Sequence, residues 1–88
     1  MADYSITFAR TARKELENLR PHDADRVLKK IELLGENPRL PGTIKLHGVK
    51  NLWRLRLGDY RVIYSINDSA KTIDVSLIRH RRDVYQDF

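Results

Sequence analysis

The sequence predicts an α+β fold, in which two N-terminal helices pack on one face of an antiparallel meander sheet in the order β-α-α-β-β-β(-β). Three features of the hydrophobic pattern predict it. Apolar residues alternate at period two near the N-terminus, recur at helical spacing up to residue 34, and alternate again after residue 43. Because 88 residues can bury one hydrophobic core, we expect residues 1–88 to form a single domain.

The first half of the chain is expected to supply one strand and both helices. Residues 3–8 alternate between apolar and polar side chains, which indicates a strand. Residues 9–20 place apolar side chains three and four positions apart, which is typical of an amphipathic helix. A second helix is expected over residues 21–34, because Pro21 suits its first turn and Gly35 suits its C-terminal cap.

The second half is expected to supply the remaining strands. Residues 36–43 contain the pairs Asn-Pro and Pro-Gly and predict a loop. Gly58 and Asp59 predict a tight hairpin between two strands. The expected strands are residues 44–46, 52–57, 60–66 and a last strand that begins at residue 72.

Strand alternation predicts that several arginines share one face of this sheet. Seven apolar side chains should face the helices: Trp53, Leu55, Leu57, Val62, Tyr64, Val75 and Leu77. Arg54, Arg56 and Arg61 should then share the opposite, open face. His80, Arg81 and Arg82 follow at the end of the last strand. A single strand arginine is usually only solvated, but several together suit phosphate groups, because each guanidinium keeps its charge and offers paired donors.

Composition and charge narrow the range of functions. The net charge is +5, and the second half of the chain carries nine basic and five acidic residues, which favours an acidic partner. The absence of cysteine excludes disulfides, thiolate metal sites and a cysteine nucleophile. Three scattered histidines, His22, His47 and His80, predict no metal site. No apolar run is long enough to cross a bilayer and the N-terminus does not resemble a signal peptide, so we expect a cytoplasmic protein without membrane contact.

The chemistry that these residues suit best is metal-free cleavage of RNA. The RNA 2′-hydroxyl attacks the neighbouring phosphorus, and positive groups stabilise the charged transition state. Tyr85 and His80 are candidate proton carriers for this reaction. The candidate electrostatic groups are Arg54, Arg56, Arg61 and Arg79.

Three stretches carry a family resemblance. KLHG at residues 45–48, LWRLRLGDYRVIY at 52–64 and IRHRRDVY at 78–85 resemble the RelE branch of the RelE/ParE toxin superfamily. The order of expected elements also matches that family, so the resemblance covers nearly the whole chain. It implies the RelE/ParE-like fold and a toxin of a type II toxin–antitoxin pair that cuts mRNA in the ribosomal A site without a cofactor.

The resemblance also implies roles for individual residues. Arg61 matches the arginine that steadies the developing phosphate charge, and Arg79 matches the arginine proposed to protonate the leaving oxygen. Tyr85 matches the tyrosine that stacks on or orients the substrate base. Arg54 and Arg56 stand where the best-studied relatives have lysines, one of them proposed as the base.

This departure leaves the base open, because a guanidinium is a poor proton acceptor. His80 is the candidate, since imidazole titrates near neutral pH. Arg54, Arg56, Lys45, Arg81 and Arg82 are expected to bind the substrate. A strict period-two count places Arg79 on the covered face, so its role requires that the last strand bends or ends before it.

Two other functions remain open, and the partners follow from the resemblance. A ParE-like protein would inhibit DNA gyrase without catalysis, and a plain RNA-binding module would bind RNA without cleaving it. The expected partners of the toxin are mRNA, the ribosome and an acidic antitoxin whose flexible segment wraps the basic surface. Operator DNA is expected only through the antitoxin complex.

Overall fold

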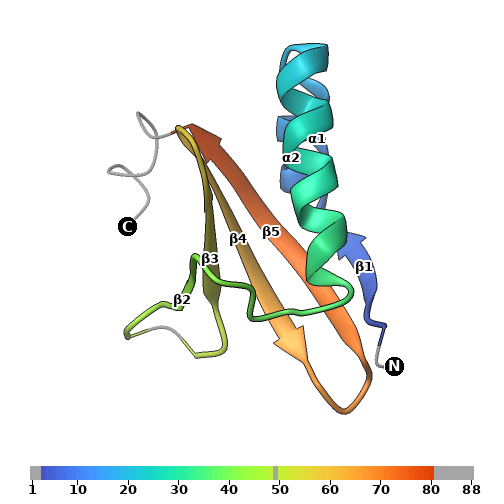
Figure 1. Cartoon of the computed structure of the whole chain (residues 1–88), viewed down its shortest axis with the longest axis vertical. Helices are drawn as coiled ribbons and strands as arrows, with labels where there is room; N and C mark the ends of the chain where they lie inside the picture. The colour runs from blue at the N-terminus through green and yellow to red at the C-terminus, as the bar shows by residue number, and fades with distance from the viewer. Residues whose placement is uncertain (1–2, 49, 81–88) are drawn as a thin grey trace.

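The computed structural model describes residues 3–48 and 50–80, which form two helices beside a five-stranded sheet (Figure 1). The elements are β1 (Ser5–Phe8), α1 (Arg10–Glu17), α2 (Pro21–Leu34), β2 (Thr43–Lys45), β3 (Trp53–Leu57), β4 (Tyr60–Asn67) and β5 (Thr72–His80). The predicted α+β fold and the predicted order of elements are confirmed. In the described part of the chain, no helix is both long and apolar enough to span a membrane.

The sheet is an antiparallel meander to which β1 adds a parallel strand. Its strand order is β1-β5-β4-β3-β2, and β2 to β5 pair antiparallel in sequence, as predicted. The pairing of β1 with β5 is parallel, which the prediction of an antiparallel sheet did not include. A parallel pair requires a long connection between its strands. The chain between β1 and β5 contains both helices and the rest of the meander, so it supplies that length.

The β3–β4 hairpin and the end of α2 each depend on a glycine. Gly58 adopts φ +56°, a conformation that suits glycine, and the two-residue turn holds Leu57 opposite Tyr60. Gly35 ends α2, but with φ −61° rather than in the left-handed conformation expected of a cap. Its backbone oxygen accepts a hydrogen bond from Tyr4 N at 2.7 Å, and a Cβ on Gly35 would lie 3.2 Å from Tyr4 O. Close approach of β1 therefore accounts for glycine at this position.

A β-bulge in β5 changes which side chains face the helices. Ile63 lies opposite Leu77 but Tyr64 lies opposite Val75, so Ser76 is an extra residue in β5. An extra residue reverses the alternation beyond it. The prediction that Leu77 faces the helices is therefore wrong.

The same bulge resolves the orientation of the end of β5. Ile78 lies opposite Val62 and is only 3% exposed, so it takes the core position after the bulge. Its neighbour Arg79 consequently faces the other side of the sheet. A role for Arg79 beside the other arginines required that β5 bends or ends before this residue. The bulge at Ser76 provides that change of direction.

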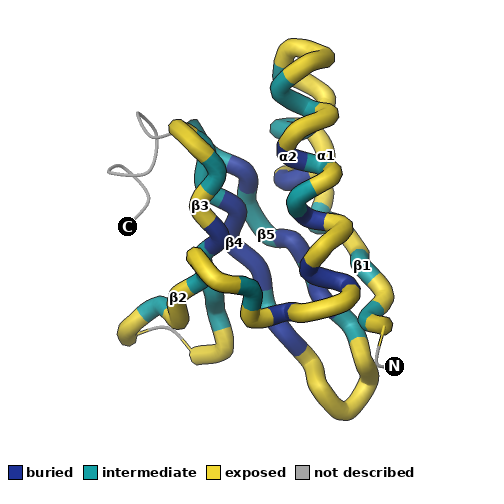
Figure 2. Tube along the Cα trace, viewed as in Figure 1, coloured by how far each residue is buried: buried dark blue, intermediate teal, exposed yellow. Residues whose placement is uncertain are grey.

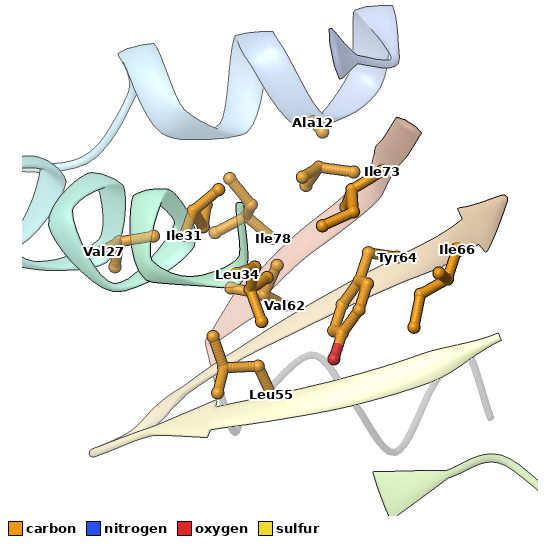
Figure 3. Packing of buried hydrophobic residues seen from close by; sticks show 11 residues of the cluster. Ala12, Val27, Ile31, Leu34, Leu55, Val62, Tyr64, Ile66, Ile73 and Ile78 are labelled. Atoms are coloured by element: carbon orange, nitrogen blue, oxygen red, sulfur yellow. The ribbon is translucent and has the colours of Figure 1, made fainter. Parts of the chain in front are cut away.

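The core fills the space between the helices and the sheet (Figures 2 and 3). Helix α1 contributes Ala12, α2 contributes three residues, and the central strands contribute the others. The members of this buried cluster are Ala12, Val27, Ile31, Leu34, Leu55, Val62, Tyr64, Ile66, Ile73, Val75 and Ile78. One polar group is anchored there: Tyr64 donates a hydrogen bond to Pro38 O at 2.7 Å, and burial raises the pKa of Tyr64 to about 12. The core thus fixes β3, β4 and β5, which carry the candidate site on their other face.

Candidate functional site

Three arginines form a row across the sheet on the face away from the helices. Arg56 of β3 lies opposite Arg61 of β4, and Arg61 lies opposite Arg79 of β5. Residues directly opposite in a ladder share a face, with Cβ atoms about 5 Å apart. Arg56 is exposed, whereas Arg61 and Arg79 are partly buried. We call these three residues the arginine row.

The row gathers positive charge at the end of the sheet that carries the β3–β4 hairpin. Like charges that face each other across a ladder destabilise a sheet by a few tenths of a kcal/mol up to about 1 kcal/mol per pair. Arg61, the central member, has such a neighbour on each side. An anion bound along the row would relieve this repulsion. The geometry therefore suits a phosphodiester, whose charged oxygens can accept hydrogen bonds from more than one guanidinium.

Next to the row, the same face carries Arg54 and an apolar patch. Arg54 lies opposite Ile63, and Ile63 lies opposite Leu77. The predicted sharing of one face by Arg54, Arg56 and Arg61 is therefore confirmed. The prediction that this face of the sheet is open is wrong at its centre, because Ile63 is only 3% exposed. The charged end of this face is thus bordered by apolar side chains.

One contact to the row comes from a residue that the sequence did not single out. Glu15 of α1 forms an ion pair with Arg79, with 2.6 Å between Glu15 Oε2 and Arg79 Nη1. Its other carboxylate oxygen accepts a hydrogen bond from Ile78 N at 2.8 Å. The only sequence signal for Glu15 is its position beside the apolar stripe of an amphipathic helix, next to Leu16. That signal does not reveal the partner.

Lys45 and His80 lie on the opposite face of the sheet from the row. Lys45 lies opposite Trp53 and His80 lies opposite Tyr60, both on the side of the helices. The His80 ring meets the Tyr60 ring edge-on, with 5.3 Å between centroids and an interplanar angle of 89°. The expectation that these two residues join the arginines is not met. For His80 the cause is strand alternation, which sends the neighbour of Arg79 to the other face.

His80 borders a separate hollow of about 350 Å³. Tyr60 donates a hydrogen bond from its hydroxyl to Asp23 Oδ2 at 3.3 Å, and Arg26 Nη1 lies 3.7 Å from Asp23 Oδ1. Burial, followed by the charge of Asp23, raises the pKa of Tyr60, so its hydroxyl remains a neutral donor at physiological pH. The hollow is lined by Asp23, Arg26, Gly58, Asp59, Tyr60 and His80.

Three expected site residues, Arg81, Arg82 and Tyr85, lie outside the described residues. Within residues 3–48 and 50–80, no group of three or more histidine, aspartate or glutamate side chains is arranged to hold a metal ion. The site that the structure does describe consists of the arginine row, Arg54 and the carboxylate of Glu15.

Comparison with known proteins shows relatives over most of the chain. A family model described as the ParE toxin of the type II toxin–antitoxin system parDE matches residues 6–85. Toxin RelG of Mycobacterium tuberculosis is 29% identical over 84 residues, which cover 94% of this chain and 97% of RelG.

Solved structures give the same picture. A chain of the toxin–antitoxin complex RelBE2 from Mycobacterium tuberculosis superposes with a TM-score of 0.79 at 28% identity, and the match covers 90% of this chain and 99% of that chain. A chain of the archaeal RelE–RelB complex from Pyrococcus horikoshii superposes with a TM-score of 0.77 at 34% identity, covering 92% and 97%.

Proposed function

This chain belongs to the ParE toxin family of type II toxin–antitoxin systems, within the RelE/ParE superfamily, and on that premise we propose that it is a metal-free endoribonuclease that cleaves ribosome-bound mRNA. The arginine row is the observation that carries the proposal. Arg56, Arg61 and Arg79 lie opposite one another on three neighbouring strands, so their guanidinium groups belong to one face of the sheet. Such a set suits phosphodiester cleavage, because negative charge develops on the phosphate in the transition state.

The proposed reaction is an internal transfer on RNA. The 2′-oxygen forms a bond to the adjacent phosphorus, the bond from phosphorus to the 5′-oxygen breaks, and the products end in a 2′,3′-cyclic phosphate and a 5′-hydroxyl. The proton of the 2′-hydroxyl passes to water as the bond forms, and the departing 5′-oxygen takes a proton from Arg79, which regains one from water. DNA is no substrate because it lacks the 2′-hydroxyl.

The arginines act on the phosphate charge in this proposal. Arg61 lies in the middle of the row and donates to the non-bridging oxygens, while Arg79 beside it donates to the departing 5′-oxygen. Arg56 and Arg54 bind the flanking backbone. His80 has no part in this set, since its ring packs on Tyr60 on the other face.

Residues 81–85 complete the proposed site by resemblance. Tyr85 would orient the substrate base, and Arg81 and Arg82 would bind the backbone near the end of β5. A base on an aromatic ring gains stacking energy that does not depend strongly on sequence. Substituting Tyr85 should therefore weaken cleavage without changing the cleavage chemistry.

An antitoxin is the proposed protein partner. The structure from Mycobacterium tuberculosis is a toxin–antitoxin complex, and the structure from Pyrococcus horikoshii is a RelE–RelB complex. With a net charge of +5, this chain suits an acidic antitoxin that covers the arginine row and so blocks access of RNA. Contact with operator DNA is proposed only for that complex, through the antitoxin.

The test is a reconstituted translation reaction with purified protein, followed by mapping of mRNA ends and chemical identification of the new termini. We expect cuts that require ribosomes, that carry a 2′,3′-cyclic phosphate and that disappear in Arg61→Ala. An inactive but folded Arg61→Ala protein is the matched control, with folding checked by circular dichroism.

A second candidate function is inhibition of DNA gyrase, which is favoured by the match of residues 6–85 to the ParE toxin family. A supercoiling assay run in parallel distinguishes it. An intact message together with loss of supercoiling would replace the nuclease by a gyrase inhibitor. An intact message with salt-dependent binding of RNA would indicate a binding module.

A further inference from the structure

Glu15 contacts two adjacent residues of β5 through its two carboxylate oxygens. Oε1 accepts the backbone N–H of Ile78 at 2.8 Å, and Oε2 lies 2.6 Å from Nη1 of Arg79. Both charged side chains are well protected, with 17% of Glu15 and 27% of Arg79 exposed. The backbone contact fixes where the carboxylate sits, and the carboxylate in turn fixes the guanidinium.

The position of Glu15 follows from where β1 ends. β1 pairs with β5 only up to Phe8, which lies opposite Val75, and α1 begins two residues later at Arg10. From that point α1, and not a strand, runs beside the outer edge of β5. A buried strand N–H needs an acceptor. Glu15 Oε1 supplies to Ile78 the acceptor that a neighbouring strand would otherwise provide.

The charge of Glu15 bears directly on the arginine row. Arg79 lies opposite Arg61, so the two guanidinium groups repel each other across the ladder. A carboxylate at ion-pair distance from Arg79 offsets this repulsion and restricts the rotamers that the long Arg79 side chain can adopt. The ion pair is made through Nη1, and because the guanidinium is a rigid plane, this contact also orients the other N–H groups of Arg79.

We propose that Glu15 is a positioning residue that holds Arg79 beside Arg61 for cleavage of the phosphodiester. This inference rests on the proposed nuclease function and deepens it. Glu15 does not touch the RNA; it acts through Arg79. A misplacement of a catalytic group by about 1 Å can lower a rate by roughly a hundredfold, so the ion pair matters for the chemical step more than for substrate binding.

The test separates this role from a purely structural one by comparing kcat and KM for ribosome-bound mRNA in a set of variants. Glu15→Gln keeps an oxygen for the N–H of Ile78 but removes the charge that holds Arg79. Glu17→Gln is the matched control, because it makes the same change on an exposed residue of the same helix. Both substitutions are also made in an Arg79→Ala background. Urea denaturation establishes that each variant is folded.

We expect Glu15→Gln to lower kcat roughly 10- to 100-fold with KM unchanged. Glu17→Gln should behave as wild type, and Glu15→Gln should have no further effect once Arg79 is alanine. If Glu15→Gln does not fold, Glu15→Asp takes its place; it keeps charge and acceptor but is shorter, and its loss of kcat should likewise vanish in the Arg79→Ala background.

Two results would overturn the inference while leaving the nuclease in place. One is an unchanged kcat in folded Glu15→Gln, and the other is an equal loss of kcat with and without Arg79. A wild-type protein that makes no cut would instead refute the proposed function, and the role of Glu15 in cleavage with it.

Discussion

The arginine row predicts a graded response to loss of charge, and the substitutions Arg61→Gln and Arg56→Gln test it. Glutamine keeps a polar side chain of moderate length and removes the charge. Arg61 is central and partly buried, with another arginine on each side, whereas Arg56 is exposed at one end of the row. Water and salt therefore screen Arg56 more than Arg61.

The expected magnitudes follow from these positions. Removal of one preorganised donor from a developing oxyanion costs about 10²- to 10³-fold in kcat, or about 3–4 kcal/mol, and we expect this for Arg61→Gln. For exposed Arg56 we expect roughly a tenfold loss, about 1.4 kcal/mol. Arg56→Gln also relieves one like-charge contact with Arg61, so the free energy of unfolding should rise by about 0.2–1 kcal/mol at low salt. This gain should shrink at high salt.

The assay is single-turnover cleavage of mRNA on ribosomes, with urea denaturation of each variant at two salt concentrations. Arg13→Gln, an exposed change of the same kind on α1, is the control and should leave both quantities unchanged. Equal losses of activity for Arg61→Gln and Arg56→Gln would contradict a graded role of the three arginines, and a lower stability of Arg56→Gln at low salt would contradict repulsion between Arg56 and Arg61.

Three further substitutions test the fold around the site. Tyr64→Phe removes the donor to the buried Pro38 oxygen and should lower the free energy of unfolding by about 1–3 kcal/mol, seen as a lower melting temperature with unchanged activity per folded molecule. Leu55→Ala removes a fully buried side chain and should cost about 2–5 kcal/mol in urea denaturation. Hydrogen bonding from Arg39 holds the pKa of Asp68 below its ordinary value, so this pair stabilises the fold above the unfolded pKa of about 3.9 and loses that contribution as pH falls through the folded pKa. Asp68→Asn should therefore be less stable than wild type at pH 7, and the difference should shrink in urea titrations as the pH falls below the unfolded pKa; a difference that stays constant over that range would contradict the assignment.

Hydrophobic periodicity was enough to predict the layers of this fold and the shared face of Arg54, Arg56 and Arg61. These predictions succeed because β3 and β4 keep a strict alternation over their facing residues, from Trp53–Tyr64 to Leu57–Tyr60. The parallel pairing of β1 was beyond such reasoning, because alternation says which side of a strand is buried but not which strand lies beside it.

In β5 the bulge at Ser76 interrupts the alternation, so the hydrophobic pattern predicts the wrong face for Leu77. One extra residue moves Leu77 to the arginine face and Ile78 to the core, and the adjacent pair of large apolar residues is the trace that it leaves in the sequence. Arg79 joins the row for this reason, and His80 leaves it for the same reason. The ion pair with Glu15 could not be predicted at all, because it joins residues 64 positions apart through a helix whose placement depends on the tertiary fold.

The fold places the Arg39–Asp68 ion pair and the arginine row at opposite ends of the sheet. At the end of the sheet that holds the β4–β5 turn, Arg39 pairs with Asp68 at 3.0 Å, and the Tyr4 hydroxyl donates to the same carboxylate at 2.6 Å. These contacts connect the loop before β2 and the start of β1 to that turn. The arginine row occupies the other end, beside the β3–β4 hairpin. There Glu15 pairs with Arg79, and the positive charges of the row suit an anion such as a phosphate. In the proposed function RNA and antitoxin compete for this surface, and either should stabilise the protein more strongly when Arg56 is present than in Arg56→Gln, an expectation that thermal melting with short RNA oligonucleotides or acidic peptides can test.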